Sequence, residues 1–222
     1  MKSKVVTKEE ALTKFSDGQT IMFGDWHGEL SAEEIITGML EKGVKDIDAI
    51  AVSGGMPDQG LGRLISEHRV KSLITTHIGL NPVARDQMFA GELAVEFVPQ
   101  GTFAERIRCG GAGLGGVLTP TGVGTIVEDS PLCLGKQTID GKEYLLMKPL
   151  HADFALVNAY KIDKAGNMWY KGTTRNFNVV AATAADVVIA EAENLVEIGA
   201  IEPENVVTPG AYIKYIVDGG KA

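Results

Sequence analysis

The feature that most constrains this chain is the alternation of short apolar runs with amphipathic helical segments through its first half. Strands separated by helices connect by right-handed crossovers, so they are expected to form a largely parallel sheet with helices on both faces. Ligands of such sheets bind beyond the carboxyl ends of the strands. The loops that follow Phe23, Val52, Thr76 and Val98 are therefore expected to gather along one edge.

Polar residues that cap helices mark where several helical segments begin. Thr7-x-x-Glu10, Ser31-x-x-Glu34 and Thr102-x-x-Glu105 each fit the capping-box pattern, in which a hydroxyl accepts a hydrogen bond from the backbone three residues further on. Asn81 followed by Pro82 is another start signal, and Gly43 is a stop signal. These positions predict where the helices start and where one of them ends.

The pattern changes in the second half of the chain, where strands prevail. Residues 138–145 predict a hairpin with Asp140 and Gly141 at its turn, and further strands are expected at 155–160, 168–170 and 187–190. No repeat, low-complexity tract or linker interrupts residues 1–222, which predicts a single domain. The predicted fold is α/β: an open, mostly parallel sheet with helices on both faces, plus a mixed β part toward the C-terminus.

Composition excludes several classes of function. The 222 residues include 21 basic and 29 acidic side chains, for a formal net charge of -8, so nucleic acid is a poor partner. Cys109 and Cys133 lack the spacing of a zinc site or a disulfide framework, so no metal is expected. The polar N-terminus and the absence of a long apolar run predict no membrane segment and a cytoplasmic protein.

Eight of the 27 glycines lie in one stretch, residues 99–125, which reads PQGTFAERIRCGGAGLGGVLTPTGVGT. Glycine at this density lets backbone or ligand approach where a Cβ atom would clash, so the stretch can form a recognition surface made of amides. Glycine-rich segments are also common as plain connectors, and residue type alone does not separate the two interpretations.

The whole stretch resembles the alpha-subunit signature of the family I (3-oxoacid type) CoA-transferases, and the similarity extends over nearly the entire chain. It includes these further motifs: Gly79-x-Asn81-Pro82, Gly91-Glu92-Leu93, Asp153-x-Ala155-Leu156, Gly166-Asn167, Arg175-Asn176-Phe177-Asn178 and Thr208-Pro209-Gly210. The resemblance implies the open α/β architecture that CoA-transferases share with some sugar-phosphate isomerases.

The resemblance also implies an activity. Members of this family exchange coenzyme A between two carboxylic acids, such as acetoacetate, butyrate and acetate, by a ping-pong mechanism. A glutamate attacks the acyl-CoA thioester to give an acyl anhydride, and the CoA thiolate then forms a glutamyl-CoA thioester. That glutamate belongs to the beta subunit, so no catalytic residue is expected here. The implied partner is a beta subunit in an alpha-2-beta-2 assembly, with CoA and acyl-CoA as substrates and no permanently bound cofactor.

The resemblance implies two binding regions, one for the acid substrate and one for coenzyme A. Gln100 follows a buried strand and Pro99, and the matching family glutamine helps to bind the acid substrate. The loop matched to CoA binding is Gly24, Asp25, Trp26, His27, Gly28, Glu29 and Leu30. Relatives usually have Gly-Gly-Phe and further glycines there, so a different backbone path is expected in this chain.

The departures from the family pattern leave alternatives open. Asp25, His27 and Glu29 indicate either a more polar pocket, suited to a hydroxy or amino acid, or solvated loop charges. Gly54 and Gly55 stand where many relatives have asparagines, which predicts extra space and altered acid selectivity. A sugar-phosphate isomerase or phosphosugar-binding protein, and a non-catalytic binding subunit, are the competing functions.

Overall fold

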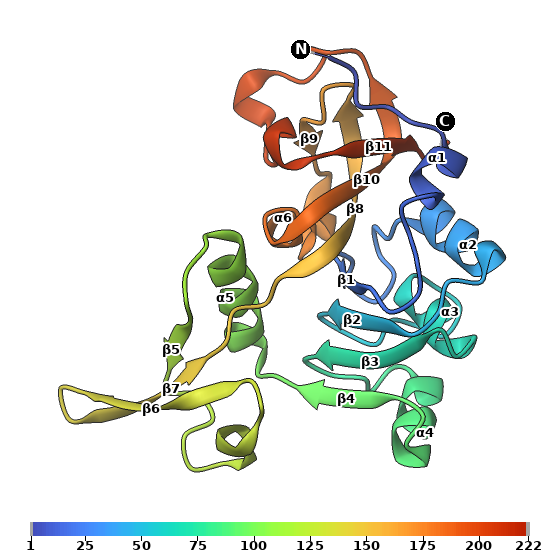
Figure 1. Ribbon diagram of the computed structural model, residues 1–222. Helices are drawn as coiled ribbons and strands as arrows, with labels where there is room; N and C mark the ends of the chain where they lie inside the picture. The colour runs from blue at the N-terminus through green and yellow to red at the C-terminus, as the bar shows by residue number, and fades with distance from the viewer. Residues whose placement is uncertain (1, 221–222) are drawn as a thin grey trace.

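The computed structural model describes residues 2–220, and its centre is an eight-stranded sheet (Figure 1). The strand order is β11-β10-β8-β1-β2-β3-β4, every pair along this path is parallel, and β9 pairs antiparallel with β8. The strands are β1 (Thr20–Phe23), β2 (Ile47–Ala51), β3 (Val70–Thr75), β4 (Ala94–Phe97), β8 (Ala152–Asp163), β9 (Met168–Trp169), β10 (Ala185–Val196) and β11 (Tyr215–Asp218).

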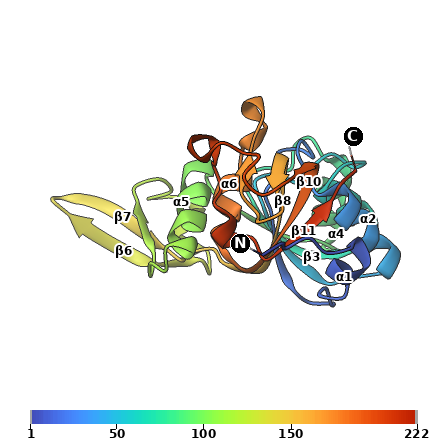
Figure 2. The same ribbon diagram turned by 90° about the horizontal axis from the view of Figure 1, so that it is seen from above.

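A second sheet of three antiparallel strands projects from the body of the molecule, as the view from above shows (Figure 2). Its order is β5-β7-β6, and its strands are β5 (Val117–Thr119), β6 (Cys133–Ile139) and β7 (Lys142–Met147). Asp140 and Gly141, both with positive φ, form the turn between β6 and β7, so the predicted hairpin is confirmed.

Helices cover both faces of the large sheet. The α-helices are α1 (Lys8–Leu12), α2 (Glu33–Lys42), α3 (Leu61–Ser66), α4 (Pro82–Ala90), α5 (Gln100–Gly111) and α6 (Asn178–Ala181), with 3-10 turns η1 (Ile126–Asp129), η2 (Gly172–Arg175), η3 (Pro203–Asn205) and η4 (Gly210–Tyr212). In β1, Ile21 and Phe23 pack into the core formed with α1 to α4, whereas Met22 packs into the core with α5 and α6. The alternating side chains of one buried strand thus serve two apolar layers.

Two of the predicted helix starts are confirmed. The hydroxyl of Thr7 accepts from the backbone N–H of Glu10 at 3.1 Å, and the side chain of Asn81 accepts from Ala84 at 3.0 Å. Gly43 ends α2 in the left-handed conformation, as its position predicted. These signals act within one turn of helix, so the local sequence is sufficient to place them.

Two predicted capping boxes are wrong. Helix α5 begins at Gln100, because Pro99 already holds φ at -54°, and Thr102 therefore lies inside the helix. Helix α2 begins at Glu33 after Ala32, and no side chain of its own segment caps it. The carboxylate of Glu191, on β10, accepts from the backbone N–H of Ile35 at 3.1 Å instead.

The open, mostly parallel sheet with helices on both faces is confirmed, but the second half differs in detail from a mixed sheet. The strands predicted at 155–160 and 187–190 are β8 and β10, which are longer and join the parallel sheet rather than a separate one. Strands β5 and β11 were not predicted. Their pairing partners are distant in sequence, so periodicity alone does not reveal them. No helix within residues 2–220 is both long enough and apolar enough to cross a membrane.

Asn81 joins α4 to the loop after β2, because its amide also donates to Gly54 O at 2.8 Å and the residue is fully buried. Asn81→Ala should lower the free energy of unfolding by about 2–3 kcal/mol, since it leaves a buried N–H and a buried carbonyl unpaired. Thr7→Ala, which removes an exposed cap, should cost only about 1 kcal/mol. Urea unfolding of the purified protein measures both, and equal losses would contradict the buried role of Asn81.

Candidate functional site

Three loops that follow β1, β2 and β3 meet at the carboxyl edge of the sheet, as the strand order predicted. Ser53 and His77 form a parallel bridge, and Gly54 N donates to His77 O at 3.2 Å. The Nε2 atoms of His27 and His77 lie 3.4 Å apart, which brings the loop after β1 against the loop after β3. The strand order changes direction between β1 and β8, and this switch point is where open α/β sheets bind ligands.

The loop after β1 makes a tight reversal. Trp26 and Glu29 are joined by backbone hydrogen bonds, and the two residues between them, His27 and Gly28, have φ of 55° and 97°. Positive φ at both central positions is the pattern of a type I′ turn. Leu30 also has a positive φ, 57°, which is uncommon for a residue with a branched side chain. The loop therefore holds a left-handed backbone without glycine at two of its positions.

Asp25 is an internal brace of this turn. Its side chain is buried, and Oδ2 accepts from the backbone N–H of Gly28 at 2.8 Å. Burial raises the pKa of the Asp25 carboxyl to about 6, and the hydrogen bond from Gly28 opposes that rise. The interpretation of Asp25 as a solvated loop charge is wrong, and its carboxylate is occupied within the loop.

The rings of His27 and His77 meet edge to face between the β1 and β3 loops, with centroids 5.0 Å apart. The hydroxyl of Thr76 donates to Val52 O at 2.7 Å and lies 2.9 Å from Nδ1 of His77. Nε2 of His77 faces Nε2 of His27. Burial and the neighbouring His77 lower the pKa of His27, which favours its neutral form.

Aromatic rings connect this loop to the start of α5. Trp26 stacks on Phe177 with centroids 6.5 Å apart and an angle of 16°, and Phe177 meets Phe103 at 5.6 Å. Phe103 lies in the first turn of α5, where Gln100 is exposed. The aromatic contacts therefore join the loop of residues 24–30 to the helical turn that begins with Gln100.

Asn178 fixes the position of the loop from α6. Its Oδ1 accepts from Asn158 N at 2.9 Å, and its Nδ2 donates to Leu30 O at 3.3 Å. A Cβ on Gly24 would lie 2.5 Å from Asn178 Oδ1, so glycine is required there. The Arg175-Asn176-Phe177-Asn178 motif thus packs the candidate binding loop in place.

Gly54 and Gly55 do not leave the extra space that the sequence predicted. Both are buried; a Cβ on Gly54 would lie 3.2 Å from Ile78, and one on Gly55 would lie 2.8 Å from the backbone N of Gly62. Gly55 also has a φ of 68°, which favours glycine. These residues permit close packing of the loop after β2, because α3 and the loop after β3 already occupy the volume beside them. Their contribution to substrate selectivity stays a prediction.

A cavity of about 500 Å³ lies on the other side of the loop, a size that suits a small-molecule ligand. Its lining residues are Gly28, Glu29, Leu30, Ser31, Glu33, Gln59, Tyr160, Lys171 and Glu193. Only Gly28, Glu29 and Leu30 were among the predicted binding residues. Tyr160, Lys171 and Glu193 were not predicted, because β8, β10 and the segment after β9 reach this edge only through tertiary pairing.

The two arginines of the glycine-rich stretch have different surroundings. Arg106 is fully buried and donates from Nε to Lys148 O at 2.6 Å, and burial lowers its pKa to about 10. Arg108 is exposed and pairs with Glu105 at 2.8 Å. Arg106 therefore holds the backbone after β7 and does not face solvent. In the described range, no group of three or more His, Cys, Asp or Glu side chains could hold a metal ion.

Comparison with known proteins gives a consistent result. The family described as Coenzyme A transferase matches residues 5–219. The acetate CoA-transferase subunit alpha of Escherichia coli K12 is 48% identical over 219 residues, covering 98% of this chain and 97% of its own. The acetoacetyl-CoA:acetate/butyrate CoA transferase alpha subunit of Clostridium acetobutylicum is 46% identical over 217 residues, covering 98% of each chain.

Solved structures agree on the fold. The glutaconate coenzyme A-transferase of Acidaminococcus fermentans superposes with a TM-score of 0.81 at 20% identity, over 97% of this chain and 75% of that chain. An acyl-CoA transferase from Escherichia coli O157:H7 gives a TM-score of 0.83 at 22% identity, over 97% of this chain and 47% of that one.

The buried Asp25 makes stability depend on pH. Because its pKa in the folded protein lies above that of the unfolded chain, its contribution is fully present below about pH 4 and is lost as the pH rises through 6. Asp25→Asn cannot ionise, so its stability relative to the natural protein should improve by up to about 3 kcal/mol between pH 4 and pH 7. Urea unfolding across this range measures the difference.

Asp58→Asn is the matched control, because Asp58 is exposed in the neighbouring loop. It should show no such trend. A pH-independent difference between the natural protein and the Asp25→Asn variant would contradict the assignment.

Proposed function

This chain belongs to the coenzyme A transferase family, and we propose that it is the alpha subunit of an acyl-CoA:carboxylate CoA-transferase acting on short-chain acids such as acetoacetate, butyrate and acetate. Similarity over nearly the whole length to alpha subunits named for acetate and acetoacetyl-CoA supports this assignment. The observation that carries it is the meeting of the β1 loop, His77 and the start of α5 at one edge of the sheet.

The start of α5 is suited to bind the carboxylate of the acid substrate. The first N–H groups of a helix have no partner within it, and the helix dipole favours an anion there. Pro99 precedes the helix and supplies no side-chain cap, so nothing from its own segment occupies these donors. The amide of Gln100 adds a further donor at an exposed position.

The covalent steps take place on the partner in this proposal. A glutamate of the beta subunit attacks the thioester carbonyl and expels the CoA thiolate, which then attacks the glutamyl side of the anhydride and releases the first acid. The second acid attacks the glutamyl-CoA thioester, expels the CoA thiolate and forms a second anhydride. The thiolate then attacks the acyl carbonyl of that anhydride, which gives the new acyl-CoA and regenerates the glutamate. This chain orients the acids, and its 500 Å³ cavity accommodates part of coenzyme A.

The projecting sheet is the surface that we assign to the beta subunit. Beside and within it, large apolar side chains are exposed to solvent: Leu114, Leu118, Ile126, Leu134 and Ile139. Exposed apolar groups gathered in one region are typical of protein interfaces. An alpha-2-beta-2 assembly and a cytoplasmic location, where the unpaired Cys109 and Cys133 remain reduced, complete the proposal.

The alternatives carry less support. The matched family and relatives favour a CoA-transferase over a sugar-phosphate isomerase. The hypothesis of transfer to a hydroxy or amino acid is supported only by His27 and Glu29, because the Asp25 carboxylate already accepts a hydrogen bond from the backbone N–H of Gly28. A non-catalytic binding subunit is separated from an enzyme subunit by assay with the partner.

Co-expression with the beta chain, followed by assay of butyryl-CoA against acetate, acetoacetate and 3-hydroxybutyrate, tests the function. We expect transfer to acetate and acetoacetate, and faster transfer to the hydroxy acid would favour the polar alternative. Borohydride trapping should locate the thioester on the beta chain. A thioester on this chain, or turnover by this chain alone, would refute the division of roles.

Gln100→Ala should lower kcat/KM for the acid substrate by about 10- to 100-fold, because it removes one hydrogen bond to the carboxylate. Steady-state kinetics of the assembled enzyme with varied acetate measures the effect. Gln19→Ala, at the opposite edge of the sheet directly before β1, is the matched control and should leave the kinetics unchanged. Equal kinetics for the two variants would exclude Gln100 from the acid site.

A further inference from the structure

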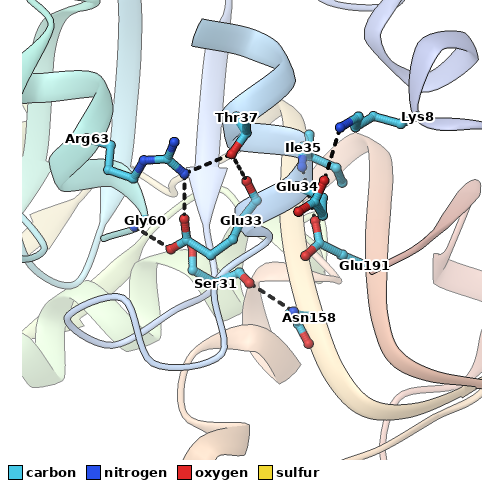
Figure 3. Close-up of polar contacts among 10 residues, drawn as sticks. All are labelled: Lys8, Ser31, Glu33, Glu34, Ile35, Thr37, Gly60, Arg63, Asn158 and Glu191. Atoms are coloured by element: carbon cyan, nitrogen blue, oxygen red, sulfur yellow. Dashed lines mark hydrogen bonds and ion pairs between the residues drawn. The ribbon is translucent and has the colours of Figure 1, made fainter. Parts of the chain in front are cut away.

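A buried carboxylate far from the acid site holds the start of α2. Glu191 on β10 is 3% exposed, and its Oε2 accepts from the backbone N–H of Ile35 at 3.1 Å (Figure 3). Helix α2 lacks a side-chain cap from its own segment, since Ala32 stands at the N-cap position. The negative charge of Glu191 therefore acts on the free N–H groups and the dipole of this helix end.

The first turn of α2 is joined to both candidate binding loops. Ser31, directly before the N-cap residue Ala32, donates from its backbone N–H to Gly28 O of the β1 loop at 3.2 Å. Glu33 accepts from Gly60 N at 2.6 Å and pairs with Arg63 at 2.9 Å, and these partners lie at the end of the β2 loop and on α3 (Figure 3). A shift of α2 would consequently move both loops.

These loops touch each other beside the cavity. A Cβ on Gly28 would lie 2.5 Å from the side chain of Gln59, so the two loops are in close contact at this point. Gly28, Gln59 and Glu33 all line the 500 Å³ cavity. The placement of α2 thus sets the distance between two of the cavity walls.

We propose that Glu191 is a positioning residue, whose buried carboxyl caps α2 and thereby holds both loops in the arrangement that binds acyl-CoA. It does not touch the substrate. The inference rests on the proposed function for its kinetic consequence, whereas the placement of the loops can be tested independently.

The charges around Glu191 are paired locally. Glu34 pairs with Lys8 of α1 at 3.0 Å, and Glu33 pairs with Arg63 of α3, so neither cation compensates Glu191 directly. Burial raises the pKa of Glu191 to about 7, with smaller opposing effects from its backbone hydrogen bonds and reinforcing effects from Glu34 and Glu33. The site therefore favours the protonated carboxyl, whose carbonyl oxygen can still accept from Ile35, and ionisation above pH 7 makes the buried arrangement less stable.

Glu191→Gln in the assembled enzyme provides the kinetic test, because the amide keeps an acceptor but no charge. From pH 6 to pH 8 we expect the KM for butyryl-CoA of the natural enzyme to rise about fivefold to tenfold relative to that of the variant, with kcat within twofold, because only the natural enzyme gains a buried charge. Glu41→Gln, exposed at the other end of α2, is the control and should match the natural enzyme at both pH values. An unchanged KM, or an equal loss of kcat at every pH, would overturn the proposal.

Hydrogen exchange of the unmodified full chain, read by mass spectrometry, tests the positioning even if the variant fails to fold or no transferase activity is found. After correction for intrinsic rates, peptides covering residues 24–36 should be more protected at pH 6 than at pH 8, because ionisation favours the opened form in which Glu191 is solvated, and peptides of α4 should not change. Equal protection at both pH values would refute the role of Glu191 and leave the proposed function untouched.

Discussion

The parallel pairing of β8 with β1 is the contact on which the rest of the structure depends. It places Ile21 to Phe23 beside Phe154 to Leu156, across more than half of the chain, and creates the point where the strand order reverses. Because every neighbouring pair on the main path is parallel, all the carboxyl ends face one edge. The β1 loop can therefore contact the β3 loop on one side and the cavity bordered by β8 and β10 on the other.

Buried ionisable side chains that do not line the cavity stabilise the segments around the site. Asp25 braces the β1 turn, Glu191 caps α2, and Arg106 fastens α5 to the segment before β8 through Lys148 O. In each case burial shifts the pKa toward the neutral form, and hydrogen bonds to the backbone are what hold the group in its site. Such groups hold backbone segments by hydrogen bonds, so they can set the geometry of a site without lining it.

Sequence reasoning succeeded where the interaction is local and failed where it is distant. The caps at Thr7 and Asn81, the stop at Gly43 and the Asp140-Gly141 turn involve neighbours within four residues, and all are confirmed. The capping boxes at Ser31 and Thr102 matched the same local pattern but were displaced, by a carboxylate 156 residues away in one case and by Pro99 in the other. Likewise, Gly54 and Gly55 predicted open space, but Ile78 and Gly62, which lie beside them only in the folded chain, occupy that volume.

The sequence by itself determined the class of fold, the family and the edge of the sheet where the binding loops gather, because strand and helix periods and short motifs are written in consecutive residues. Only the tertiary structure decided which side chains face that edge. Tyr160 and Lys171 reach the cavity, Asp25 turns inward and Glu191 caps a helix across the sheet, since each of these outcomes depends on the register of strands paired over long separations.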